Sequence, residues 1–193
     1  MTSIIHEIER IVEAACADES NIFGYGIWTH HITQVAVNAR RLAPQFHADP
    51  EVVEIAALLH DYAGIKDAAL HQDHHIHGPI EAERILRRLN YPAEKIAMVK
   101  ECIATHRASV RVETRSAEGA CLATADAIAH IEHVPSLLHY VFVQRGMGID
   151  EGTQWVKQKL QRSWQKVSPQ VQSAMQEQYE AALRTLTVLE VSS

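Results

Sequence analysis

Histidine and aspartate residues that could bind a metal recur along this chain, which has 13 histidines among 193 residues. His60 and Asp61 are adjacent, and His60 follows Ala56 by four residues, on or beside the apolar face of a predicted helix. Burying an imidazole beside a carboxylate costs free energy unless both are hydrogen-bonded, ion-paired or bound to a metal. The dipeptide alone therefore fits either a satisfied His–Asp pair or part of a metal site.

Asp126 is the only charged residue in the segment ACLATADAIA, residues 120–129. An apolar segment of this kind is typical of a buried helix. A buried carboxylate without a partner would destabilise the fold, so Asp126 needs either a cation such as Arg107 or Arg111, or a metal ion. His130 lies one turn further on, where it either packs in the core or supports Asp126.

Other histidines could complete such a site. His31 precedes Val35 by four residues at the edge of an inward helix face, and its neighbour His30 points about 100° away. Three imidazoles fall within residues 74–77, and His106 ends a later predicted helix. For each histidine taken alone, packing or solvent exposure without a role is the alternative interpretation.

The elements that must position these side chains are helices. Apolar residues recur at spacings of three and four almost throughout, with no convincing alternation of period two and no internal repeat. The predicted helices cover about 3–17, 29–46, 50–63, 78–89, 92–106, 117–131, 134–147, 153–167 and 170–189. Loops are predicted over 64–77 and 107–116. The sequence thus predicts an all-α fold of eight or nine helices.

Composition excludes several classes of protein. Hydrophobic residues make up 47% and charged residues 22%, which argues against disorder. The net charge of −6 argues against binding to a nucleic acid polymer or a membrane surface. Three scattered cysteines cannot form a disulfide framework, and no apolar stretch approaches the ~18 residues of a membrane-spanning helix. We expect a cytoplasmic protein.

Taken in chain order, the pattern H…HD…H…H…D resembles the HD-domain metal-dependent phosphohydrolase superfamily. The segments that carry the resemblance, over roughly 25–135, are HHITQVAVNARRLA, IAALLHDYAGIKD, HHIHGPIEAERIL and CLATADAIAH. The resemblance implies an HD-domain-like helical bundle. We expect an N-terminal helix (1–24) packed on the core, an HD-type metal-binding domain (25–147), and a C-terminal helical hairpin (148–193) as an extension of the same domain.

The resemblance also implies the ligands. The first metal would be bound by His31, His60, Asp61 and Asp126, and a second by His74 and His106, with Asp61 bridging. The spacing to Gly78 and the following residues favours His74, whereas alignment on His-Gly-Pro would select His77 instead. Imidazole and carboxylate ligands suit one or two divalent transition metals (Mn, Fe, Co, Ni or Zn) better than Mg.

Such a centre can lower the pKa of bound water from 15.7 towards about 7 and offset charge on a phosphate oxygen. We therefore predict His60, Asp61 and Lys66 as catalytic residues, with Lys66 and Arg107 contacting the substrate phosphate; Arg111 is a further basic neighbour. The function that the resemblance implies is a metal-dependent phosphohydrolase. Its substrate would be a phosphomonoester or phosphodiester of a nucleotide or similar small metabolite, attacked by metal-activated water.

Two other functions remain open from the sequence. A di-iron oxygenase of the HD fold would use the same six ligands. A non-catalytic nucleotide- or metal-binding regulatory module would use the C-terminal helices as an output or homodimer surface, where Trp155, Leu160 and Trp164 form either an interface or part of the core. Substrate specificity would come from loops such as 20–28, whose Phe23 and Tyr25 either stack on a base or cap the core.

Overall fold

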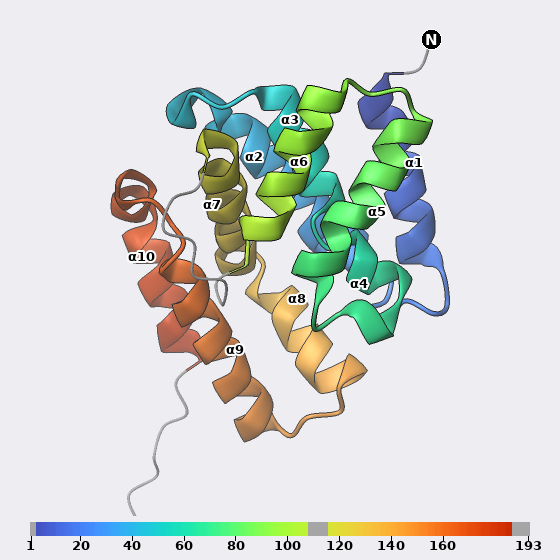
Figure 1. Cartoon of the computed structure of the whole chain (residues 1–193). Coiled ribbons are helices and arrows are strands. Elements are labelled where there is room, and N and C mark those ends of the chain that lie inside the picture. Colours follow the sequence, from blue (N-terminus) through green and yellow to red (C-terminus); the bar gives the residue numbers. More distant parts are fainter. Residues whose placement is uncertain (1–2, 108–115, 187–193) are drawn as a thin grey trace, which may run out of the picture.

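The computed structural model describes residues 3–107 and 116–186, and within them it contains helices and no strand (Figure 1). The all-α prediction is confirmed. The α-helices are α1 (Ile4–Ala17), α2 (Thr33–Phe46), α3 (Pro50–Leu59), α4 (Tyr62–Lys66), α5 (His74–Arg88), α6 (Ala93–Thr105), α7 (Ala117–Glu132), α8 (Val134–His139), α9 (Ile149–Trp164) and α10 (Pro169–Thr185). None of the helices in this part of the chain has the length and apolar character needed to cross a membrane.

Helix α7 lies at the centre of the bundle. It packs against α2, α3, α6 and α9, and its residues from Cys121 to Ile131 are all buried. Figure 1 shows α1 and α5 on one side of this centre and α9 with α10 on the other. One hydrophobic core therefore extends from Ile8 of α1 to Leu160 of α9, and it fixes the inward-facing side chains of α7 in place.

The helix predicted over 50–63 is interrupted at His60 and Asp61. Helix α3 starts as expected, with the Asp49 carboxylate accepting hydrogen bonds from the backbone N–H groups of Glu51 and Val52. It ends at Leu59, and α4 begins at Tyr62 after Asp61 takes a φ of −103° and a ψ of 0°. In a regular helix neighbouring side chains diverge by about 100°. The break lets both side chains face the same point.

Helix α5 begins at His74, four residues before the predicted start at 78. The sequence prediction placed residues 74–77 in a loop. Gly78 lies where α5 packs on α6. A Cβ atom at Gly78 would lie 2.8 Å from Ile103 Cγ2 on α6, so the missing side chain allows α5 and α6 to pack closely. His74 is thereby placed in the first turn of a helix rather than in a loop.

The helix predicted over 153–167 also starts earlier than predicted. Helix α9 begins at Ile149 and includes Gly152, where a Cβ atom would lie 2.5 Å from Phe142 Cε1. The turn before α9 is made by Gly146 at φ +62°. Leu160 is fully buried, and Trp164 stacks on Tyr179 of α10 with ring centroids 4.2 Å apart. These contacts within the chain account for residues that the sequence also allowed as an interface.

Replacing Gly78 by alanine should destabilise the protein by about 1–3 kcal/mol, because the new methyl group overlaps Ile103 and pushes α5 away from α6. Urea unfolding measures the change in free energy. Gly26→Ala is the matched control, since a Cβ atom there would meet its nearest neighbour at an ordinary 3.7 Å. Equal stability of the two variants would contradict the role given to Gly78.

Candidate metal centre

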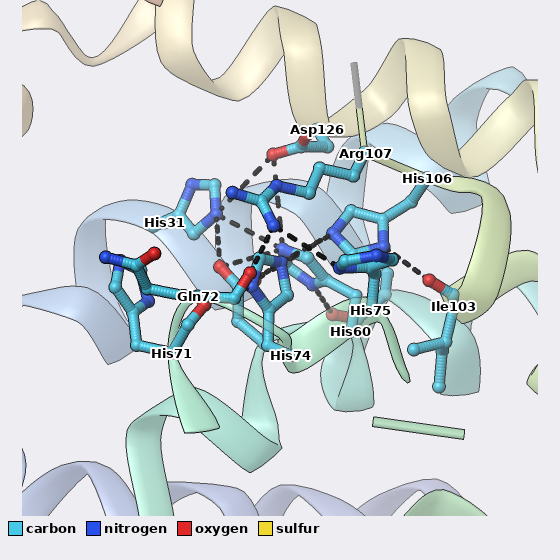
Figure 2. Close-up of polar contacts among 12 residues, drawn as sticks. His31, His60, His71, Gln72, His74, His75, Ile103, His106, Arg107 and Asp126 are labelled. Atoms are coloured by element: carbon cyan, nitrogen blue, oxygen red, sulfur yellow. Dashed lines mark hydrogen bonds and ion pairs between the residues drawn. The ribbon is translucent and has the colours of Figure 1, made fainter. Parts of the chain in front are cut away.

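Four predicted ligands from separate elements converge at one point (Figure 2). His31 comes from the π-helical turn Trp28–Ile32 that leads into α2, His60 and Asp61 from the break between α3 and α4, and Asp126 from α7. The Nε2 atoms of His31 and His60 are 3.2 Å apart, and each lies within 3.4 Å of Asp61 Oδ2. Asp126 Oδ1 lies 3.6 Å from His31 Nε2 and 4.0 Å from His60 Nε2.

The second carboxylate oxygen of Asp61 faces a different group. Asp61 Oδ1 lies 3.2 Å from His74 Nε2 and 3.9 Å from His106 Nε2, and these two nitrogens are 3.3 Å apart. One carboxylate is therefore shared between two clusters of ligand atoms. We name them the first cluster (His31, His60, Asp61, Asp126) and the second cluster (Asp61, His74, His106).

The outer nitrogens of three rings are hydrogen-bonded to backbone carbonyls. Nδ1 of each ring lies 2.6–2.7 Å from the carbonyl oxygen three residues earlier, in the pairs His60–Ala57, His74–His71 and His106–Ile103. A ring that donates from Nδ1 keeps a lone pair on Nε2, which is the form that binds metals. The carbonyl three residues before each of these histidines therefore selects the tautomer.

The donor set fits metal ions. Lone pairs on neighbouring Nε2 atoms repel one another unless a proton or a cation lies between them. Metal–nitrogen and metal–oxygen bonds of about 2.0–2.2 Å place ligand atoms of one ion roughly 3.0–3.6 Å apart, close to the separations in both clusters. His60 is fully buried and His106 nearly so. Metal binding is therefore the chemistry that best satisfies the Nε2 lone pairs of these rings.

Charge coupling shifts the pKa values in the cluster. Burial opposes ionisation of Asp61 and Asp126, but His60 beside Asp61, and Lys166 and His130 beside Asp126, hold the pKa of each carboxyl well below its usual range. Burial works against the charged form of His60, but the Asp61 carboxylate raises the pKa of this imidazole. Burial, reinforced by His60, lowers the pKa of His106 to about 3. Both carboxylates are thus ionised and His106 is neutral at physiological pH.

The structure brings His74 into the second cluster and leaves His77 outside both clusters. His77 lies three residues further along α5, almost one helical turn beyond His74, and it belongs to none of the groups of converging ligand atoms. The ligand roles themselves stay a proposal.

Lys66 is not near either cluster, which corrects its prediction as a catalytic and phosphate-binding residue. Its ammonium group is exposed and lies 3.2 Å from the Glu81 carboxylate on α5. The five residues Tyr62–Lys66 form α4, and this helix directs Lys66 away from the cavity that Asp61 lines. Arg107 does line that cavity, donating to the Gln72 carbonyl with His75 Nδ1 at 3.3 Å (Figure 2). Arg111 lies outside the described residues.

The cation that pairs with Asp126 is Lys166, which the sequence reasoning missed. Its ammonium group bonds the Asp126 carboxylate and donates to the His106 carbonyl at 3.4 Å. Lys166 follows α9, forty residues from its partner, and the signal that could have found it is helical spacing. Residues that line the same cavity recur along α9 and the turn after it at Trp155, Lys159, Arg162, Ser163 and Lys166.

His130 contacts two residues of the first cluster, Asp126 and His31. Its Nδ1 atom lies 3.4 Å from Asp126 Oδ1 and 3.3 Å from the Ser163 hydroxyl, and its ring stacks on that of His31 with centroids 4.8 Å apart. Of the two interpretations that the sequence allowed, the supporting contact to Asp126 is the one observed.

A cavity of about 900 Å³ opens over both clusters. Asp61, His74, His106 and Asp126 line its base, and the side chains of α9 form one wall. Phe23, Tyr140 and Trp155 also line it, with the Phe23 and Tyr140 rings 5.3 Å apart. Tyr25 instead is exposed and donates to Glu13, and Trp28 is buried.

Comparison with known proteins agrees with this geometry. The HD domain family model matches residues 28–131, which include His31, His60, Asp61, His74, His106 and Asp126. The chain belongs to the HD-domain family. The resemblance seen in the sequence is confirmed, and with it the coarse assignment to a family of metal-dependent hydrolases.

Two solved structures are similar to this HD-domain protein. Bacillus subtilis YpgQ in complex with ADP superposes with a TM-score of 0.67 at 21% identity, over 94% of this chain and 93% of that one. A predicted HD superfamily hydrolase from an uncultured Thermotogales bacterium has 29% identity and a TM-score of 0.49, over 63% of this chain. This match spans 65% of the Thermotogales protein, less than two thirds of its length. No curated protein matches the chain significantly.

His74→Ala should lower the metal content from about two ions per chain towards about one, because the second cluster loses one of its three donor side chains. Elemental analysis of purified protein measures the content. His77→Ala is the matched control on the same helix and should leave it unchanged. Loss of metal in the His77 variant with none in the His74 variant would reverse the assignment.

Metal affinity should fall as the pH is lowered from about 8 to about 6. A proton on Nε2 competes with the metal, and the raised pKa of His60 makes this competition begin at a higher pH than for an ordinary histidine. Competition with a chelating dye at several pH values measures the affinity. An affinity that stays constant or rises on acidification would contradict imidazole ligation.

Proposed function

We propose that this HD-domain protein is a metal-dependent phosphohydrolase acting on a phosphomonoester or phosphodiester of a nucleotide or similar small metabolite. The observation that carries the proposal is the shared carboxylate. Asp61 presents Oδ2 to the first cluster and Oδ1 to the second, at the base of a cavity that also has cationic side chains. This arrangement suits a bridged pair of divalent ions facing an anionic substrate.

Different residues of the chain would bind the metal ions and the substrate. His31, His60, Asp61 and Asp126 would bind the first ion, and His74 and His106 would complete a second site with Asp61. Bound ions of this kind supply hydroxide at neutral pH and offset charge on phosphate oxygens. Asp61 and His60 then act by fixing the position of the attacking water relative to the ester phosphorus.

Substrate phosphate would contact Arg107, which lines the cavity close to the second cluster. Its guanidinium group is held by the Gln72 carbonyl just before α5. A guanidinium presents several N–H donors at once, so one contact to a carbonyl leaves others for phosphate oxygens. Lys66 has no part in this proposal, because its charge is paired with Glu81 outside the cavity.

Two observations support a nucleotide as the substrate. The cavity has an aromatic side, formed by Phe23, Tyr140 and Trp155, on which a base could stack. In addition, the fold relative YpgQ was crystallised with ADP, and we extend nucleotide binding from that protein to this chain as a proposal. The cavity volume of about 900 Å³ is sufficient for a nucleotide-sized ligand.

A di-iron oxygenase would use the same six ligands, but it gives no role to the cationic wall of the cavity. Lys159, Arg162 and Lys166 line that wall, and a substrate with phosphate groups gives them one. A regulatory module would bind the same ligands as an enzyme and differ from it only in leaving them unchanged. A turnover measurement distinguishes the two, and iron content with a mixed-valence magnetic signal would identify the oxygenase.

Asp61→Asn should lower metal-dependent phosphate release by about 10³-fold or more, because the amide cannot bridge two ions as a carboxylate does. The assay measures phosphate released from nucleoside mono-, di- and triphosphates, and nucleoside monophosphate formed from cyclic nucleotides, by protein loaded with Mn, Co or Zn. Lys66→Met should retain activity, because Lys66 lies outside the cavity.

The control for metal dependence is removal of the ions with a chelator, followed by reconstitution. Loss and return of activity are expected. Metal-loaded protein that binds one of these substrates and leaves it unchanged would overturn the enzymatic proposal and favour the regulatory module. Equal loss of activity in the Lys66 and Asp61 variants would overturn the assignment of roles.

A further inference from the structure

The cationic wall of the cavity comes from a part of the chain outside the matched HD segment. That segment ends at residue 131, whereas Lys159, Arg162 and Lys166 belong to α9 and the turn that follows it. Lys159 and Arg162 lie on α9, Lys166 lies in the turn after it, and all three line the cavity. A segment that contributes no ligand to either cluster therefore contributes three cations to the cavity.

Lys159 has no hydrogen-bond or ion-pair partner among the residues that the structure describes, although it lines the cavity. Burial lowers the pKa of its ammonium group, against the attraction of Asp126. Placing a cation where its hydration is reduced and no carboxylate bonds it costs free energy. An anionic ligand in the cavity would recover that cost.

Lys166 is paired, but with a carboxylate that metal binding would engage. Its side chain is 5% exposed, and its ammonium group bonds Asp126 while also donating to the His106 carbonyl. A divalent ion on Asp126 would compete for the negative charge of that carboxylate. The charge of Lys166 would then need an anion from elsewhere.

Cationic side chains outnumber carboxylates around the cavity. Four cationic side chains line it, namely Arg107, Lys159, Arg162 and Lys166, against the carboxylates of Asp61, Asp126 and Glu132. Glu132 is already engaged by Asn38 and Arg41 on α2. Two divalent ions would add four positive charges, which together favour a substrate that carries more charge than a monoester dianion.

We propose that Lys159 and Lys166 form a binding site for a second phosphoryl group, so that the cavity selects a substrate with two or more linked phosphoryl groups. The inference rests on the proposed function, since it places the first phosphoryl group at the metal clusters. The C-terminal helices thus determine specificity, while the HD segment provides the metal ligands. The substrate class is a diphosphate or triphosphate ester rather than a monophosphate.

The first test measures equilibrium binding of two inorganic probes, phosphate and pyrophosphate, by isothermal titration calorimetry. It uses the full chain as purified, in a solution buffered with the metal ion that the protein carries, and in the absence of turnover. Wild type should bind pyrophosphate about tenfold or more tightly than phosphate, because pyrophosphate gains a charge-assisted contact to the lysines. Equal affinity for the two probes would overturn the proposal without any variant.

The second test replaces Lys159 by methionine, which keeps the length of the side chain and removes its charge. Pyrophosphate affinity should fall by about tenfold, while phosphate affinity should change by less than about threefold. Lys157→Met is the matched control, because Lys157 lies on the same helix and does not line the cavity. Lys159→Arg should restore most of the preference. An unchanged preference for pyrophosphate in Lys159→Met would overturn the proposal.

Different outcomes would overturn the second phosphoryl site and the phosphohydrolase activity. Metal-dependent hydrolysis together with an unchanged preference in Lys159→Met would leave the phosphohydrolase intact and overturn the second phosphoryl site. Absence of hydrolysis, with selective loss of pyrophosphate binding in the variant, would overturn the enzyme and support the binding site.

Discussion

The interruption of the helix at His60 and Asp61 is the constraint on which the centre depends. In an unbroken helix these side chains would point about 100° apart, and one of them would miss the cluster. The break turns Asp61 so that its two oxygens face two pairs of histidines. His31 and His60, from the π-helical turn Trp28–Ile32 and the end of α3, lie on one side, and His74 and His106, from α5 and the end of α6, lie on the other. All four imidazoles have to reach this carboxylate, which explains why separate parts of the bundle meet there.

Close packing of helices makes that convergence possible. Helix α7 has alanine at positions 123, 125, 127 and 129 around Asp126, so neighbouring helices can approach it closely. Gly78 does the same for α5 against α6. Small residues thus bring backbones together at the points where short side chains such as aspartate must reach imidazoles on other helices. The buried carboxylates remain tolerable because histidines and Lys166 surround them.

Much of the site follows from the sequence, because its members carry local signals. Asp126 is a single charge in an apolar helix, and His31 lies on the inward stripe; both are where the sequence predicted them. Lys66 illustrates the limit. It lies five residues from Asp61, but proximity along the chain does not specify direction, because α4 turns Lys66 towards Glu81 on α5 and away from the cavity. The start of α5 differs from the prediction because residues 74–77, which the sequence placed in a loop, form its first turn.

Lys166 and Lys159 were not predicted as part of the site, although helical spacing over residues 155–166 marks one face of this segment. Which part of the protein that face meets depends on the tertiary packing of α9 on α7, and no local pattern specifies it. The separation of metal ligands and cavity cations between two parts of the chain has a chemical reason. Metal ligation demands fixed geometry, so its residues belong to tightly packed helices of the HD segment. Recognition of an anion tolerates variation in distance, because charge attraction falls off slowly. A segment outside the HD segment can therefore supply cations for recognition, and one of them, Lys166, also bonds the Asp126 carboxylate.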